Sequence, residues 1–149
     1  MKRVLLVTLC AALAGSVAAA QPLNPRDMKW GPAPPGLPAG AQVAVLSGNP
    51  EREGMFTIRL RFPPGYRVMP HRHPSDELVT VIQGQVGLGM GRTFSPRRAR
   101  TVVTGGYSLM PANMNHYAFT RGGAIVQVTA HGPFQIIYVN PRDDPRTKR

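Results

Sequence analysis

Apolar and polar residues alternate in short runs from residue 42 onward, and glycine or proline separates the runs. The clearest run is FTIRLRF (56–62), in which the phenylalanines, Ile58 and Leu60 face one way and the polar residues face the other. Strict alternation is typical of a half-buried β-strand. No stretch after residue 41 shows the 3.6-residue period of an amphipathic helix over a helical length.

Similar runs predict further strands along the rest of the chain. They lie at 42–47, 66–73, 77–84, 85–91, 101–104, 107–111, 115–120, 124–130 and 134–140. Short strands with frequent turn signals between them are typical of a β-sandwich or a small barrel. The predicted fold class is therefore all-β.

Residues 21–41 differ in composition from the rest of the chain, because they contain six prolines. Proline lacks the amide donor and fixes φ, which disfavours both a helix and a central strand. We interpret this segment as an extended arm that precedes the domain. Trp30, the only tryptophan, is the residue expected to pin the arm onto it.

Residues 1–20 have the anatomy of a secretory signal peptide. Two basic residues near the start precede an apolar run, and small alanines end the segment. The apolar stretch is short and interrupted for a membrane-spanning helix, which is the alternative interpretation. A lipid anchor at Cys10 is disfavoured because Cys10 lies inside the apolar run. We therefore predict cleavage after Ala20 and a periplasmic or secreted protein with no membrane span after cleavage.

Composition then limits the chemistry. Cys10 is the only cysteine and would leave with the signal peptide, so a metal would have to be held by His, Asp or Glu. The formal net charge is +11, with basic clusters at 92–100 and 141–149. Nucleic acid is not the expected partner, because export is predicted and the clusters lack interleaved aromatic residues. We expect a solvated loop and tail; attraction of an anionic ligand by the Arg92–Arg100 loop is the alternative.

A histidine-rich stretch near the middle of the chain suggests a metal site. His71 and His73 are two residues apart, so on a strand their side chains share a face. The turn that follows would return Glu77 toward them on the next strand. Neutral imidazoles and a carboxylate are ligands that borderline divalent metals accept.

The spacing in this stretch is regular. Gly65 is followed after five residues by His71, with His73 next but one, then Glu77 after three residues and Gly84 after six. A polar, exposed loop with unrelated histidines is the simpler interpretation of the same residues.

A second stretch has a related pattern. Gly105 is followed after five residues by Pro111, with Asn113 next but one and His116 after two more residues. Thr120 ends the pattern. Together the two stretches resemble the two motifs of the cupin family. The first motif fits fully; in the second, Asn113 replaces the usual glycine and Thr120 the usual asparagine. Asn tolerates the left-handed turn that glycine would make.

The resemblance covers about residues 42–140 and implies a single cupin domain, a double-stranded β-helix or small jelly-roll barrel. The basic residues at 141–149 form a tail after this domain. It implies one divalent metal ion held by His71, His73, Glu77 and His116; Fe, Mn, Ni, Cu and Zn all remain open. A homodimer is implied by the resemblance alone.

Fold does not fix function. The first hypothesis is an exported metal-dependent oxygenase, a dioxygenase for example, that acts on a small organic molecule, with Glu77 also catalytic as a proton acceptor. A Lewis-acid isomerase or lyase with the same ligands is the second. A protein that binds a metal or small ligand without turnover is the third.

Other polar residues have undecided roles. Gln127, Thr129 and His131 share one face of the strand at 124–130 and its continuation. Alternation defines that face without showing whether it is inward. If it is, Gln127 would reach a metal-bound ligand. Tyr107 and Tyr117 flank the second motif, and each is either a proton donor near the site or a packing residue.

Overall fold

The computed structural model describes residues 22–147, so the predicted signal peptide lies outside the described residues. The strands are β1 Gly31–Pro32, β2 Gln42–Ser47, β3 Gly54–Phe62, β4 Arg67–Arg72, β5 Glu77–Met90, β6 Arg100–Val103, β7 Tyr107–Met110, β8 His116–Phe119, β9 Ala124–Gly132 and β10 Ile137–Tyr138. Three single-turn 3₁₀ helices complete the list: η1 Pro25–Asp27, η2 Pro141–Asp143 and η3 Pro145–Thr147. Within residues 22–147 no helix has the length and hydropathy needed to cross a membrane.

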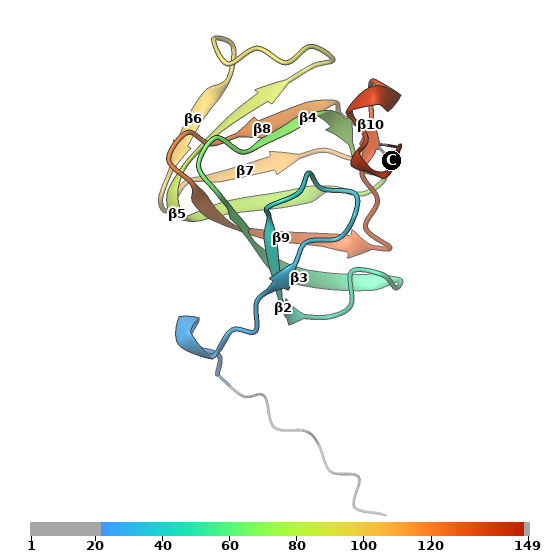
Figure 1. Cartoon of the computed structure of the whole chain (residues 1–149). Coiled ribbons are helices and arrows are strands. Elements are labelled where there is room, and N and C mark those ends of the chain that lie inside the picture. Colours follow the sequence, from blue (N-terminus) through green and yellow to red (C-terminus); the bar gives the residue numbers. More distant parts are fainter. Residues whose placement is uncertain (1–21, 148–149) are drawn as a thin grey trace, which may run out of the picture.

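All strand pairs are antiparallel, and β5 is shared by both halves of a curled sheet (Figure 1). Its first half pairs with β9 and β7, and its second half pairs with β8 and β6. One half of the sheet continues from β9 through β3 and β2 to β1, and the other continues from β8 through β4 to β10. The all-β barrel prediction is confirmed.

Residues 77–90 form one strand where the pattern predicted two. The strand bends at Gly84, which has φ +78°. A Cβ atom there would lie 2.6 Å from the carbonyl oxygen of Gly123, so both the left-handed backbone and the close approach require glycine. The register with β9 also shifts between Val81 and Gln83. The bend therefore lets one strand serve both halves of the sheet.

The core fills the interior of the curled sheet. The predicted inward residues of β3 are all buried, and so are Val126, Val128 and Ala130 on β9. Each large apolar side chain buried in this way contributes about 1.5–3 kcal/mol. On β3, the alternation that predicted the strand therefore also identified its buried face.

The proline-rich arm contacts the barrel at residues 30–32. Gly31 and Pro32 pair with the start of β2, which gives the arm a two-residue edge strand. The guanidinium carbon of Arg61, on β3, lies 4.0 Å from the centre of the Trp30 ring. This cation–π contact agrees with the expectation that Trp30 pins the arm.

Candidate metal centre

A bulge in β4 turns the first histidine inward. Val68 pairs with Ala118 and His71 pairs with His116, so β4 has one residue more than β8 in this interval. An extra residue of this kind breaks the alternation and re-aims a side chain. Pro70, which has no amide to donate, lies inside the interval. Val68 and His71 are consequently both buried although they are three residues apart.

Three imidazoles meet inside the barrel. His71 lies on β4, His73 lies just beyond its end, and His116 begins β8. One nitrogen of each ring lies within 4.8 Å of the others, and all three residues are buried. The structure thus brings together the three histidines that the sequence predicted as ligands.

Backbone carbonyls fix the orientation of each ring. The Nδ1 atom lies 2.7 Å from Met69 O in His71, 2.7 Å from Gln135 O in His73 and 2.9 Å from Met114 O in His116. A carbonyl oxygen only accepts, so each Nδ1 donates and each Nε2 keeps its lone pair. Such a second bond is how protein backbones orient metal-binding histidines.

Glu77, the first residue of β5, completes the cluster on one side. Its Oε2 lies 3.3 Å from His116 Nε2 and 3.6 Å from His73 Nε2. Among the described residues, both of these buried Nε2 atoms lack a hydrogen-bond partner. Lone pairs and a carboxylate thus face one another with no donor between them, an arrangement that a proton or a metal cation would stabilise.

Burial governs protonation in the cluster. Burial, with the neighbouring His116 and His73, lowers the pKa of His71 to about 3, and burial also lowers the pKa of His73. Burial alone would raise the pKa of Glu77, but the adjacent imidazoles of His116, His73 and His71 lower it overall. Burial therefore favours neutral rings, while the carboxylate favours positive charge beside it. A divalent cation satisfies both preferences.

A cavity of about 50 Å³ lies in front of these groups. Apart from the three histidines and Glu77, every side chain that lines it is apolar. They come from several strands, from the arm and from the loop after β9: Leu37, Leu60, Phe62, Val68, Val79, Val86, Leu88, Met110, Ala118, Val126, Val128, Phe134 and Ile136. Neither lysine nor arginine lies among the lining residues.

The undecided polar residues of β9 lie outside this cavity. Gln127 accepts a hydrogen bond from Arg59 Nε at 3.2 Å on the outer face of the sheet. The Thr129 hydroxyl lies 3.0 Å from that of Thr57, and His131 is exposed. The hypothesis that Gln127 contacts a metal-bound ligand is therefore wrong.

The two tyrosines also lie away from the histidines. Tyr107 is 57% exposed, whereas Tyr117 is fully buried and donates to Ser95 O at 2.7 Å. The Tyr117 ring covers Gly89, where a Cβ atom would lie 2.0 Å from the ring. Neither tyrosine lines the cavity, so their interpretation as proton donors at the site is wrong.

The loop before His116 is tied to the first motif by contacts that sequence analysis did not predict. Asn113 has φ +63°, as its place in the turn predicted, and its N–H donates to His73 O at 2.7 Å. Its Oδ1 accepts from Arg72 Nη1, and Asp76 Oδ1 accepts from Ala112 N, both at 2.7 Å. In the sequence, the signal for these contacts was the presence of polar residues next to the predicted ligands in both motifs: Arg72, Asp76 and Asn113.

Thr120, which departs from the second motif, is a buried polar residue. Its side chain is 3% exposed, and among the described residues its hydroxyl has no hydrogen-bond partner. Its N–H donates to Tyr66 O at 3.0 Å. The substitution thus affects a position outside the histidine cluster.

Comparison with known proteins identifies relatives by sequence. Residues 19–135 match the family described as ChrR cupin-like domain. The rhicadhesin receptor of Pisum sativum is 30% identical over 87 residues, which are 58% of this chain and 40% of that protein. The chain thus matches less than half of the length of this curated relative.

Solved structures share the fold at low identity. The polyketide cyclase RemF from Streptomyces resistomycificus has a TM-score of 0.67 and 19% identity, over 85% of this chain and 89% of that one. A proposed acetylacetone dioxygenase from Methylibium petroleiphilum has a TM-score of 0.64 and 20% identity, over 88% of each chain. At these identities the similarity establishes the fold alone.

Proposed function

The chain belongs to the family of ChrR cupin-like domains, and on this premise we propose that it is a metal-dependent enzyme of the oxygenase type. The observation behind the proposal is the buried convergence of three imidazole lone pairs and one carboxylate. Within a protein, such a mixed nitrogen and oxygen donor set suits a borderline divalent metal.

His71, His73 and His116 would hold the metal, with Glu77 as a fourth ligand. Bound there, the metal would act as a Lewis acid and, if it is redox-active, would support oxygen chemistry. Glu77 is the carboxylate positioned to take a proton from a substrate, and burial keeps water away from it. The three backbone carbonyls keep the rings aimed at one point before any ligand arrives.

The cavity wall suggests the substrate class. A sugar or an anion would lose its hydration on entry and would find no hydroxyl, amide, lysine or arginine side chain among the lining residues. We infer a small, mainly apolar molecule with one or two oxygen atoms that reach the metal, such as an alkyl diketone. No residue of the Arg92–Arg100 loop lines the cavity. This argues against the alternative that the loop attracts an anionic ligand to the site.

A Lewis-acid isomerase or lyase that acts on an apolar carbonyl compound is the second candidate, since the same ligands would serve it. The test reconstitutes the mature protein separately with Fe(II), Mn(II), Ni(II), Cu(II) and Zn(II). Oxygen uptake and products are then followed over diketones of increasing alkyl length, with catechols and uronic sugars as comparison compounds.

Turnover of diketones only with redox-active metals and oxygen would support the oxygenase. Anaerobic turnover with Zn(II) would support the isomerase or lyase. Metal uptake without any turnover would favour a non-catalytic ligand-binding protein, and turnover of sugars alone would contradict the substrate class. Glu77→Gln is the matched variant, which we expect to reduce turnover more than ligand binding.

Export remains part of the proposal. The basic start, apolar run and alanines of residues 1–20 support cleavage after Ala20. Intact-mass measurement of protein recovered from the periplasm or the medium tests it. A recovered chain that retains Met1 would contradict cleavage.

A further inference from the structure

The cavity in front of the histidines is small for a ligand site. Its volume of about 50 Å³ holds a few water-sized groups. Pockets for small organic ligands are commonly ~300–1,000 Å³. A substrate of the class proposed above therefore requires part of the wall to move.

One part of the wall lies outside the barrel strands and belongs to the arm. Residues 33–41, here called the strap, form a loop that is closed by a hydrogen bond from Ala33 N to Ala41 O at 3.0 Å. The N–H of Leu37 donates back to Pro34 O, also at 3.0 Å. The side chain of Leu37 is 8% exposed and lines the cavity.

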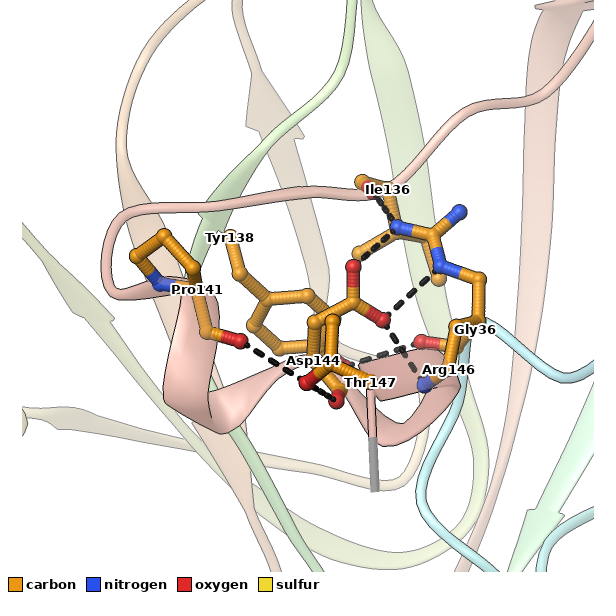
Figure 2. Close-up of polar contacts among 7 residues, drawn as sticks. All are labelled: Gly36, Ile136, Tyr138, Pro141, Asp144, Arg146 and Thr147. Carbon is orange, nitrogen blue, oxygen red and sulfur yellow. Dashed lines mark hydrogen bonds and ion pairs between the residues drawn. The ribbon is translucent and has the colours of Figure 1, made fainter. Parts of the chain in front are cut away.

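Two buried tyrosines hold the strap on either side of Leu37. The Tyr138 hydroxyl donates to Gly36 O at 2.9 Å (Figure 2), and the Tyr66 hydroxyl donates to Pro38 O. Burial raises the pKa of both hydroxyls, that of Tyr138 to about 12, so both are donors at neutral pH. The Tyr138 ring also lies 5.8 Å, centre to centre, from the His71 ring.

The C-terminal segment holds the backbone close to Tyr138. Arg146 Nη2 donates to Ile136 O at 2.8 Å and to Asp144 Oδ2 at 2.7 Å (Figure 2). Ile136 lines the cavity, two residues before Tyr138. The arm and the C-terminal segment thus meet at the same side of the cavity.

We propose that the strap is the entrance to the cavity and that Leu37 sets the size of the apolar ligand that is admitted. The hydroxyls of Tyr66 and Tyr138 keep the strap closed, and a ligand enters when both bonds to the strap carbonyls open. This inference builds on the proposed function, because the substrate of that reaction has to reach the histidines.

The test uses benzene as an apolar probe on the mature, full-length protein as purified. NMR exchange measurements give the affinity and the rates of entry and exit. Hydrogen exchange at the Ala33 and Leu37 amides reports strap opening. The variants are Leu37→Ala and the double change Tyr66→Phe with Tyr138→Phe, which removes two hydroxyls and leaves the cavity size unchanged.

We expect the double tyrosine variant to exchange benzene and strap amides at least roughly 10-fold faster, with little change in benzene affinity. Leu37→Ala should raise both the affinity and the entry rate. Leu60→Ala, which enlarges the cavity from β3, should raise the affinity alone. Tyr117→Phe removes a buried hydroxyl that is bonded to Ser95 and should change neither rate.

Wild-type exchange rates in the double tyrosine variant would overturn the inference. So would a failure of benzene to bind both the wild type and Leu37→Ala, or equal effects of Leu37→Ala and Leu60→Ala on the entry rate. Benzene binding requires neither metal nor turnover. A failure of the proposed reaction would therefore leave these results unchanged, and the two proposals can fail separately.

Discussion

Two strands of this barrel show similar alternation in sequence and opposite orientation in space. On β4 and just beyond it, the polar residues His71 and His73 face inward, and Arg72 between them faces the Asn113 side chain outside the cavity. On β9, the polar residues at 127, 129 and 131 face outward and the apolar residues between them line the core. Polar alternation therefore defines a face without defining its direction.

The difference follows from what each polar group contacts. The inward histidines have their Nδ1 protons satisfied by carbonyl oxygens, and their remaining lone pairs share one point with Glu77. The outward residues of β9 bond to the matching outer residues of β3. A polar residue that faces the interior therefore requires a hydrogen-bond partner or a bound ligand. A polar residue on the outer face requires neither, because water can satisfy it.

Removal of an inward histidine should have the largest effect. We expect His73→Ala to lower metal affinity by more than ~100-fold, because loss of a ligand exceeds the 10–100-fold cost of losing a supporting bond. His131→Ala on β9 should leave metal content at the wild-type value, since its exposed ring lies outside the cavity. Metal analysis after dialysis measures the metal content of both variants. Equal metal content would contradict the expected difference between β4 and β9.

Acid should destabilise the metal-free protein through the inward histidines. Their pKa values are lowered by burial in the folded state, to about 3 for His71, whereas the unfolded value is about 6.5. Between these values the unfolded chain binds protons that the folded protein does not. The free energy of unfolding should therefore fall as pH decreases from about 6.5 toward 3, by up to about 1.4 kcal/mol per unit for His71.

Urea unfolding at several pH values measures this slope. Glu77 acts in the same direction at lower pH, because its lowered pKa gives stability that is present above its unfolded value and is lost as pH falls through the folded one. His71→Gln should flatten the slope. An unchanged slope in that variant would assign the acid sensitivity to other groups.

A matched exchange on β9 tests direction within a single strand. Val128→Thr places a hydroxyl on the apolar cavity wall and should destabilise the protein by about 1–3 kcal/mol. Thr129→Val, one residue later on the outer face, should cost less than about 1 kcal/mol, because it removes one partly exposed hydrogen bond. Urea unfolding at neutral pH compares them, and the reverse order of stability would contradict the orientation of β9.

The outward residue of β4 should have the smallest effect on metal binding among the residues tied to the site. Arg72 holds Asn113, whose N–H holds the carbonyl of His73. We expect Arg72→Ala and Asn113→Gly each to weaken metal affinity by roughly 10-fold or less, and the double variant by no more than either alone. Asn113→Gly keeps the left-handed turn and loses only the side chain. Additive losses in a titration would show that the two residues act independently.

Much of the fold was predictable from local sequence. The alternation in 56–62 identified both the strand and its buried face, and the spacing of His71, His73, Glu77 and His116 identified side chains that the structure brings together. The direction of the face on β9 was not predictable, because it depends on which strands flank it. The strap and its tyrosines were also missed, because Tyr138 reaches Gly36, the neighbour of Leu37, only after the two ends of the chain meet.

The shared strand β5 also has a consequence for how the chain folds. Its partners β7 and β9 on one half and β6 and β8 on the other all follow it in sequence, and β9 pairs with Glu77 through the distant Ala130. Neither half of the sheet can therefore form from strands that are adjacent in sequence alone. Segments that are distant in the chain have to be brought together before most strands can pair. All-β topologies with many such non-local pairings typically fold in milliseconds to seconds. We therefore expect the four polar groups of the cluster to come together at a late step, when both halves of the sheet have closed on β5.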